Sequence, residues 1–424
     1  MHHGANGLSR RALIRRVAST ALGVHVYDAF GTIRHGLAAG SVGPDVNVIF
    51  LQMRGAMSHL DTFDPKPGRE EQGKTKPIKT QTAGVQFGEH LPKLAGLSER
   101  LAVLRGMTTE TGAHEQATYL MRTSYSALNS IVHPSMGAWT LHAKGKKAKD
   151  LPGFVLVGNG NEHPGAGFLD PSYTPVPVAD PTRGLENTTQ PAYLSDAQFK
   201  RRLSLADQID KKFRATHAGP QVAAYDQMYK DATRLLGSTD LAAFDLAQEP
   251  DKVRARYGES KFGQGCMLAR RLVESGVRCV EVELGGWDMH RDIFDDLPAK
   301  VGELDAGMSA LLTDLSDRGL LASTLVVLAT EFGRTPEINQ NAGRDHHPAV
   351  FSCVLAGAGV KGGTVFGASD ERGFHPDDGA VTVADFNTTI AHAAGLPYTK
   401  EFSAPNGRPF KIGGGGDPIR AVLA

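Results

Sequence analysis

Cysteine is scarce in this chain, which has three cysteines among 424 residues. Cys266, Cys279 and Cys353 are far apart in the sequence, so the chain has no basis for a paired-thiol metal site or a disulfide framework. Cys279 and Cys353 lie within apolar runs, and we expect both to be buried thiols of the core. A metal site, if there is one, must be built from nitrogen and oxygen ligands.

Charge of one sign and long apolar runs are lacking as well. Lysine plus arginine equals aspartate plus glutamate at 46 each, so no overall basic field indicates a nucleic-acid or anionic-membrane partner. Any anionic substrate would therefore have to be attracted locally. No apolar run reaches the roughly 20 residues of a membrane span. Aromatic residues make up 7% and there are 49 glycines, a composition typical of a loop-rich globular enzyme.

The first 44 residues have the pattern of an export signal. Ser9–Ile14 reads SRRALI, which predicts a twin-arginine signal, and Val17–Val24 would be its short hydrophobic region. We expect cleavage near Ala38 and Ala39, with the folded domain starting around Asp45. The export machinery would carry a folded, metal-loaded protein to the periplasm or outside the cell. The alternative is a basic amphipathic leader or an ordinary helix.

Apolar runs with the look of buried strands alternate with helical patterns along the chain. The runs cover residues 46–51, 101–105, 151–157, 277–284, 324–330 and 350–356. A helix is expected near residues 265–275, and a longer one has an apolar stripe of Val301, Leu304, Met308, Leu311, Leu312 and Leu315. This alternation predicts an α/β domain with a mostly parallel central sheet and helices on both faces.

The pattern changes within that domain, which we place at residues 45–409. Residues 193–248 are charged, rich in alanine and helical in pattern, with Leu205, Ile209 and Phe213 spaced for one face, and we expect an all-helical insertion. Residues 410–424 are rich in glycine, and we expect a mobile tail.

Polar clusters follow the later strands. Asp288 and His290 come after one apolar run, Glu331 directly follows another, and a loop then brings Asp345, His346 and His347. The carboxyl ends of strands in open α/β sheets are where ligands bind, and imidazole with carboxylate suits a divalent metal. Adjacent histidines point apart, so one of the pair should bind the ion, and we favour His347 because Pro348 stiffens its position.

With these residues laid out, the chain resembles the bacterial DUF1501 family, which belongs with the alkaline phosphatase and sulfatase superfamily. The resemblance runs from about Val46 to Pro397. It depends on matching segments at residues 58–67, 286–290, 330–336, 345–348, 362–367 and 384–390.

The resemblance implies an alkaline phosphatase-like fold with a metal centre at the carboxyl edge of the sheet. The positions that match the superfamily's ligands and nucleophile are Asp61 or His59, a hydroxyl of Thr109 or Thr111, Asp288 with His290, Glu331, and His346 or His347. Phe332 stands where the superfamily has an imidazole, so one of two metals would be lost or held differently. The cysteine or serine motif of the sulfatases is absent and His114 stands near its place, so a formylglycine mechanism is not expected.

Several of these positions have two readings. Thr109, Thr111 and His114 are candidate catalytic residues. They precede a helix expected to begin near Glu115, whose amides could cradle an anion, or they could form an ordinary cap. Arg334 could pair with a substrate oxyanion, or with Glu331 or Asp288. In the loop after the first strand, Asp61 could be a metal ligand and His59 a substrate contact. Alternatively, both could be groups that order the loop. Ser135 is a rival hydroxyl that we expect to be a helix cap.

Together these features predict an exported, metal-dependent hydrolase of phosphate or sulfate esters with one or two ions of zinc, manganese, iron or calcium. The substrate would be a small anionic ester or a sulfated or phosphorylated glycan. The attacking group would be metal-bound water or a threonine hydroxyl. The alternatives are a non-catalytic periplasmic binding or scaffold protein with the same fold, and phosphoryl transfer or mutase chemistry.

Overall fold

The computed structural model describes residues 44–424, apart from 161, 187, 189–192 and 218–219. The twin-arginine motif at Ser9–Ile14 and the apolar segment Val17–Val24 lie outside the described residues, so export stays a prediction. In the described part of the chain, no helix combines the length and the apolar character needed to cross a membrane.

A nine-stranded sheet forms the centre of the fold, in the order β12-β4-β11-β8-β1-β7-β5-β6 with β15 beside β4. Within the described residues its pairings are parallel except for those of β11, which runs antiparallel to β4 and β8. The predicted mostly parallel sheet is confirmed. The strands are β1 (Asn47–Met53), β4 (Leu101–Thr108), β5 (Phe154–Val157), β6 (Val176–Val178), β7 (Cys279–Leu284), β8 (Thr324–Thr330), β11 (Phe351–Gly357), β12 (Thr364–Phe366) and β15 (Val381–Thr382).

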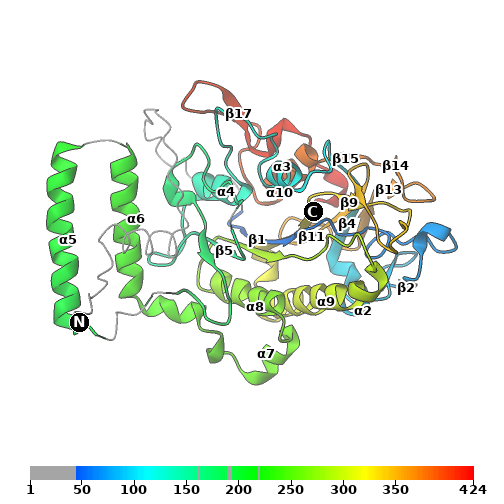
Figure 1. Ribbon diagram of the computed structural model, residues 1–424, viewed down its shortest axis with the longest axis horizontal. Coiled ribbons are helices and arrows are strands. Elements are labelled where there is room, and N and C mark those ends of the chain that lie inside the picture. The colour runs from blue at the N-terminus through cyan, green and yellow to red at the C-terminus, as the bar shows by residue number, and fades with distance from the viewer. Residues whose placement is uncertain (1–43, 161, 187, 189–192, 218–219) are drawn as a thin grey trace, which may run out of the picture.

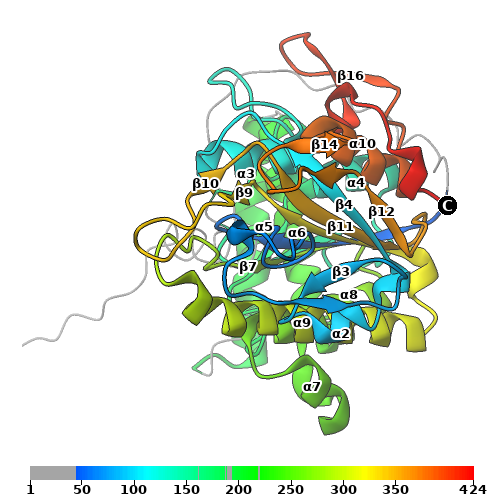
Figure 2. The ribbon, with the colours of Figure 1, turned by 90° about the vertical axis from the view of Figure 1, so that its right-hand side faces the viewer.

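Helices cover both faces of this sheet (Figure 2). One face carries α2 (Pro92–Ala95), α8 (Lys261–Glu274) and α9 (Ile293–Asp317), with α7 (Asp251–Tyr257) beyond them, and the other carries α3 (His114–Thr123), α4 (Met136–Lys144) and α10 (Val383–Ala393). The predicted apolar stripe of α9, from Val301 to Leu315, is fully buried in the hydrophobic core between α9 and the central sheet. All three cysteines are buried as free thiols.

Among the described residues, four two-stranded sheets lie outside the central sheet. They pair β2 (Pro77–Lys79) with β3 (Gln86–Gly88), β9 (Gly333–Arg334) with β10 (His346–His347), β13 (Ala368–Ser369) with β14 (Pro376–Asp378), and β16 (Glu401–Ser403) with β17 (Pro409–Lys411). The pair of β9 and β10 matters most here, because it lies beyond the end of β8 and carries Arg334 and His346.

Two long helices occupy most of the range in which we expected a helical insertion. They are α5 (Asp196–Thr216) and α6 (Pro220–Leu236), which stand beside each other at one end of the molecule (Figure 1). The side chains of Leu205, Ile209 and Phe213 lie in the solvent rather than in a core.

The glycine-rich tail is folded against the domain, so our expectation of a mobile tail was wrong. Ile412 and Val422 are fully buried in the core that contains α10. Gly413 has φ of 78°, and a Cβ there would lie 2.3 Å from the hydroxyl oxygen of Thr388. Glycine at this position therefore permits close packing and a left-handed backbone.

Candidate metal centre

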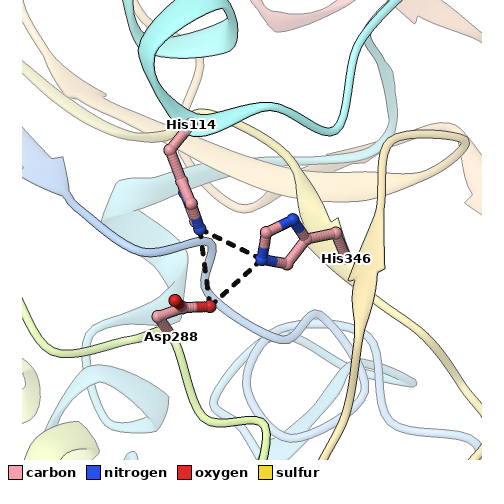
Figure 3. Close-up of side chains that lie close together, drawn as sticks. All are labelled: His114, Asp288 and His346. Carbon is pink, nitrogen blue, oxygen red and sulfur yellow. Dashed lines mark hydrogen bonds and ion pairs between the residues drawn. The ribbon is translucent and has the colours of Figure 1, made fainter.

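Four polar side chains meet beyond the carboxyl ends of β4, β7 and β8. His114 is the first residue of α3, Asp288 and His290 lie in the loop after β7, and His346 is the first residue of β10. Figure 3 shows His114, Asp288 and His346 turned toward one another from three separate parts of the chain.

The donor atoms of this group are close together. Nε2 of His346 lies 3.1 Å from Nε2 of His114 and 3.1 Å from Oδ1 of Asp288, and His114 Nε2 lies 3.4 Å from the same oxygen. Nε2 of His290 is 3.0 Å from both His346 Nε2 and Asp288 Oδ1. Ligand atoms about 2.0 Å from a tetrahedral ion are separated by roughly 3.3 Å, so the mutual distances among His114, Asp288 and His346 suit a single metal ion, with His290 beside them.

The other nitrogen of each imidazole faces an acceptor. Nδ1 of His114 lies 2.9 Å from Oε1 of Glu331, Nδ1 of His290 lies 2.6 Å from Oδ1 of Asp345, and Nδ1 of His346 lies 2.7 Å from the Gly112 carbonyl oxygen. A proton on each Nδ1 leaves a lone pair on each Nε2. Three lone pairs and a carboxylate then converge, an arrangement that favours a cation. Acceptors behind metal-binding histidines are the usual second layer of such sites.

The electrostatics of the centre favour a positive charge at the same place. The hydrogen bond with Glu331 raises the pKa of His114 above its ordinary value, against the lowering effect of burial. Burial alone would raise the pKa of the Asp288 carboxyl, but the hydrogen bond and charge of Arg334 and the nearby histidines hold it below its usual range. A metal ion and protons would therefore compete for this site.

Phe332 fixes the positions of two of the imidazoles. Its buried ring lies with its centroid 4.9 Å from that of His114 and 4.9 Å from that of His346. An aromatic ring at this position cannot bind an ion, but it restrains both histidines and keeps water from one side of them.

Arg334 is fully buried beside the centre, and its Nε, Nη1 and Nη2 atoms all contact protein acceptors. Nε donates to the Ala56 carbonyl at 3.0 Å, and Nη1 donates to the Arg344 carbonyl at 3.1 Å and faces His290 Nε2 at 3.4 Å. Nη2 donates to the Gly55 carbonyl and to Asp288 Oδ1. Of the two readings of Arg334, this geometry favours the structural pair with Asp288, because Nε, Nη1 and Nη2 each donate to a protein group.

The sequence profile of the family described as "Protein of unknown function (DUF1501)" matches residues 45–423. The chain belongs to the DUF1501 family. None of the curated proteins matches this DUF1501 chain in sequence.

Solved structures with a similar fold are distant from this DUF1501 protein. The C-terminal periplasmic domain of EcEptC from Escherichia coli, in complex with zinc, has 11% identity and a TM-score of 0.39, over 91% of this chain and 99% of that one. The lipoteichoic acid synthase LtaP from Listeria monocytogenes has 11% identity and a TM-score of 0.39, over 83% and 72%. The PsFucS1 sulfatase from Pseudoalteromonas sp. has 14% identity and a TM-score of 0.35, over 84% and 69%. Similarities at this level carry no argument about activity.

Of the adjacent histidines, the DUF1501 chain turns His346 and not His347 into the centre. His346 pairs with Arg334 and His347 with Gly333 in the short sheet of β9 and β10, and neighbours in a strand face opposite sides. His347 Nε2 instead donates to the Phe374 carbonyl at 2.7 Å. The preference for His347 is thus corrected by strand alternation, which outweighs the stiffening effect of Pro348.

Glu331 lies behind the centre rather than among its four converging donors. Its Oε1 accepts from Nδ1 of His114 and, at 2.7 Å, from the backbone N–H of Gly55. Our expectation that Glu331 is a ligand is corrected to that of a group that orients His114, because His114 comes between its carboxylate and the other donors.

Asp61 and His59 have structural contacts away from the centre. The Asp61 carboxylate is fully buried, with Arg344 Nε at 2.8 Å and the hydroxyls of Ser58 and Thr75 at 2.5 and 2.7 Å. His59 Nε2 donates to the Gly373 carbonyl at 2.9 Å. Of the two readings of these residues, the structure favours groups that order the loop after β1.

The candidate hydroxyls do not contact the four donors either. Thr111 Oγ1 accepts from the Ala113 N–H at 3.2 Å, which is a local turn contact before α3. Thr109 Oγ1 is buried without a hydrogen-bond partner in the described part of the chain. Ser135 is the N-cap of α4, as expected, and accepts from the N–H of Ala138.

Sequence reasoning gave His114 a catalytic role and missed Asp345 and the Gly112 carbonyl as partners of the histidines. The position of His114 at the start of a helix after β4 was visible in the sequence. Its partnership with residues more than 170 positions away was not, since it arises because the carboxyl ends of β4, β7 and β8 lie at the same edge of the sheet.

Proposed function

We propose that this DUF1501 protein is a metal-dependent hydrolase of phosphate or sulfate esters. The observation that carries the proposal is the convergence of three imidazole Nε2 atoms and Asp288 Oδ1, with every Nδ1 held by an acceptor. His114, Asp288, His290 and His346 would hold the ion. A divalent cation supplies charge to a substrate oxyanion and makes water more acidic, which both kinds of ester hydrolysis need.

The donor set favours one ion of zinc, manganese or iron. Three nitrogen donors and one oxygen suit these metals, whereas calcium takes oxygen ligands almost exclusively. Arg334 supplies a second positive charge next to the ion, in contact with Asp288 Oδ1. Because this guanidinium balances the Asp288 carboxylate, a divalent ion would keep most of its charge for an anionic ester.

The protein residues have separate tasks in this proposal. Glu331 and Asp345 orient His114 and His290 and keep a proton on Nδ1 of each ring. Phe332 restrains His114 and His346 from one side. No threonine hydroxyl contacts the four donors among the described residues, which favours water over a side-chain nucleophile.

The second candidate is a binding or scaffold protein that has kept the fold without turnover. The lack of a hydroxyl nucleophile at the four donors, within the described residues, is the observation that favours it. Both functions are consistent with export by the twin-arginine pathway to the periplasm or beyond, which the motif at Ser9–Ile14 supports and which fractionation of cells expressing an Arg10→Lys, Arg11→Lys double variant would test.

Metal content tests the proposal most directly. We expect about one equivalent of metal by elemental mass spectrometry in the purified full-length protein, and its loss in His346→Ala. His347→Ala is the matched control, because it removes the neighbouring imidazole, which faces away, and it should keep the metal. Hydrolysis of p-nitrophenyl phosphate or sulfate should be lost with the metal.

Three results would decide against the hydrolase. Wild-type protein that stays free of metal when titrated with zinc, manganese and ferrous iron would exclude the centre. Metal lost equally from His346→Ala and His347→Ala would show that the loss reflects unfolding or another site. Metal bound by wild type without hydrolysis of either class of ester would favour the binding protein.

A further inference from the structure

Helix α5 has an exposed outer side that the metal centre does not explain. The helix has 21 residues, and none of them is buried. Figure 1 shows α5 at the outer end of the molecule, with α6 between it and the rest of the domain. A long helix with no buried residue is stabilised only weakly by packing against its neighbours. Packing within the domain therefore does not explain which side chains α5 presents to solvent.

An apolar stripe runs along this outer side. Leu205, Ile209 and Phe213 follow one another at four-residue spacing and are 56%, 40% and 51% exposed. Residues at this spacing lie on one face of a helix, one turn after another. A contiguous row of large apolar side chains in solvent is typical of an interaction surface.

Basic residues flank the stripe without partners. Arg201, Arg202 and Lys212 are exposed, and at 100° per residue all three lie within about 60° of the direction of Leu205. Among the residues that the structure describes, none of them forms an ion pair, and we call this set of six residues the α5 outer face.

The other side of α5 has its charges neutralised. Asp207 pairs with Lys211 at 3.1 Å and with Arg214 at 3.4 Å, and Arg214 also pairs with Asp226 of α6. The helical spacing places Asp207, like Asp196 and Asp210, away from the α5 outer face. The uncompensated charge of the helix is thus concentrated beside its apolar stripe.

We propose that the α5 outer face binds an anionic lipid surface, with the helix axis lying in the plane of the interface. Leucine, isoleucine and phenylalanine would enter the boundary between headgroups and acyl chains, and the arginines and lysine would contact the phosphates. The charge argues against a second copy of the chain as the occupant, because two such faces repel each other. The apolar stripe argues against a nucleic acid, which would take the charges and leave these side chains exposed.

Vesicle co-sedimentation of the full-length protein tests the proposal. We expect binding to vesicles containing phosphatidylglycerol, weakened by salt, and at least about tenfold weaker binding to pure phosphatidylcholine. Two triple variants should each lose binding about tenfold or more: Leu205→Gln, Ile209→Gln, Phe213→Gln, and Arg201→Gln, Arg202→Gln, Lys212→Gln. The control is Lys200→Gln, Lys211→Gln, which removes positive charge from the opposite side of α5 and should change binding less than about threefold.

Several results would overturn the proposal. Binding that persists in both triple variants would place the lipid contact elsewhere in the chain. Loss in the basic variant alone, with the apolar variant unchanged, would indicate a general polyanion site. A dimer that dissociates in the apolar variant, seen by light scattering, would make a second copy the occupant. Circular dichroism and metal content would confirm that each variant is folded.

Discussion

At the scale of single residues, the centre is assembled from histidines whose partners decide what they do. His346 and His347 are neighbours in sequence, yet one faces the converging donors and the other bonds the Phe374 carbonyl. Glu331 and Asp288 both follow apolar strands, yet one stands behind a histidine and the other among the donors. Residue type was readable from the sequence, whereas the role came from the direction of each side chain.

Glu331→Gln tests the supporting role of that carboxylate. We expect metal affinity to fall about 10- to 100-fold, because an amide is a poorer acceptor for the His114 Nδ1 proton and lowers the basicity of Nε2. Competition with a chelating dye would measure this, with the exposed Glu337→Gln as a control from the same segment. Unchanged affinity in Glu331→Gln would show that His114 is oriented by something else.

His59 gives the fold a dependence on acid. Burial lowers its pKa from 6.5 to about 4, and its Nδ1 has no partner in the described structure. The unfolded chain therefore takes up a proton at higher pH than the folded chain does. As the pH falls from 6.5 toward 4, the unfolded chain binds a proton at His59 and the folded chain does not. The free energy of unfolding therefore falls by about 3 kcal/mol over this range, and above pH 6.5 His59 causes no such loss.

The His59→Gln variant keeps a donor for the Gly373 carbonyl but does not titrate. Urea unfolding between pH 7 and pH 4 should show a smaller loss of stability in this variant than in wild type. His217→Gln, which replaces an exposed histidine, should unfold with the pH dependence of wild type. Equal pH dependence in His59→Gln and wild type would contradict a buried neutral imidazole.

At the scale of elements, apolar periodicity predicted most of the strands and helices, but not their directions. The run at 350–356 is a strand as expected, but β11 is antiparallel to both neighbours. Its own residues do not encode this, because a strand buried on both faces is uniformly apolar in either direction. The stripe of α9 and the spacing in α5 look alike in sequence, yet the first is buried and the second is in solvent.

Paired substitutions in α9 and α5 test that difference. Leu311→Ala should lower the free energy of unfolding by about 3 kcal/mol, because Leu311 is fully buried and a cavity would remain. Leu205→Ala replaces the same residue type at an exposed position of a helix and should cost less than about 0.5 kcal/mol. Chemical denaturation would measure both. Similar costs would mean that the α5 outer face is covered in solution.

At the scale of the whole molecule, the carboxyl-terminal tail closes over α10. Asp417 N–H donates to Asp385 at 2.8 Å, and Ile419 N–H donates to Thr389 at 2.9 Å. Lys361 N–H donates to the Val422 carbonyl at 2.9 Å, which ties the end of the chain to the loop after β11. The tail is therefore part of the domain, in agreement with the family match to residue 423.

Two glycine substitutions distinguish a packed tail from a mobile one. Gly413→Ala should cost about 3 kcal/mol, because the new methyl group meets Thr388 and the backbone has positive φ. Gly407→Ala also has positive φ but meets nothing within 4 Å, so it should cost about 1 kcal/mol. Thermal unfolding with calorimetry would compare them, and equal effects would favour a loose tail.

The sequence by itself determined the class of fold, the residue types of the candidate centre and the edge of the sheet where they lie. It could do so because apolar runs specify buried strands, and polar residues directly after such strands must lie at their carboxyl ends. The resemblance to DUF1501 added the order of the motifs. None of these properties depends on where distant parts of the chain meet.

Tertiary structure alone decided which side chains converge. His114 lies close to Asp288 and His346 because the carboxyl ends of β4, β7 and β8 lie at one edge of the sheet. Asp61 lies away from these donors because it pairs with Arg344. The neutral total charge likewise concealed the basic outer face of α5, since composition averages over surfaces that the fold separates. The direction of a side chain and its contact partners depend on contacts between distant segments of the chain. The local sequence pattern does not contain this information.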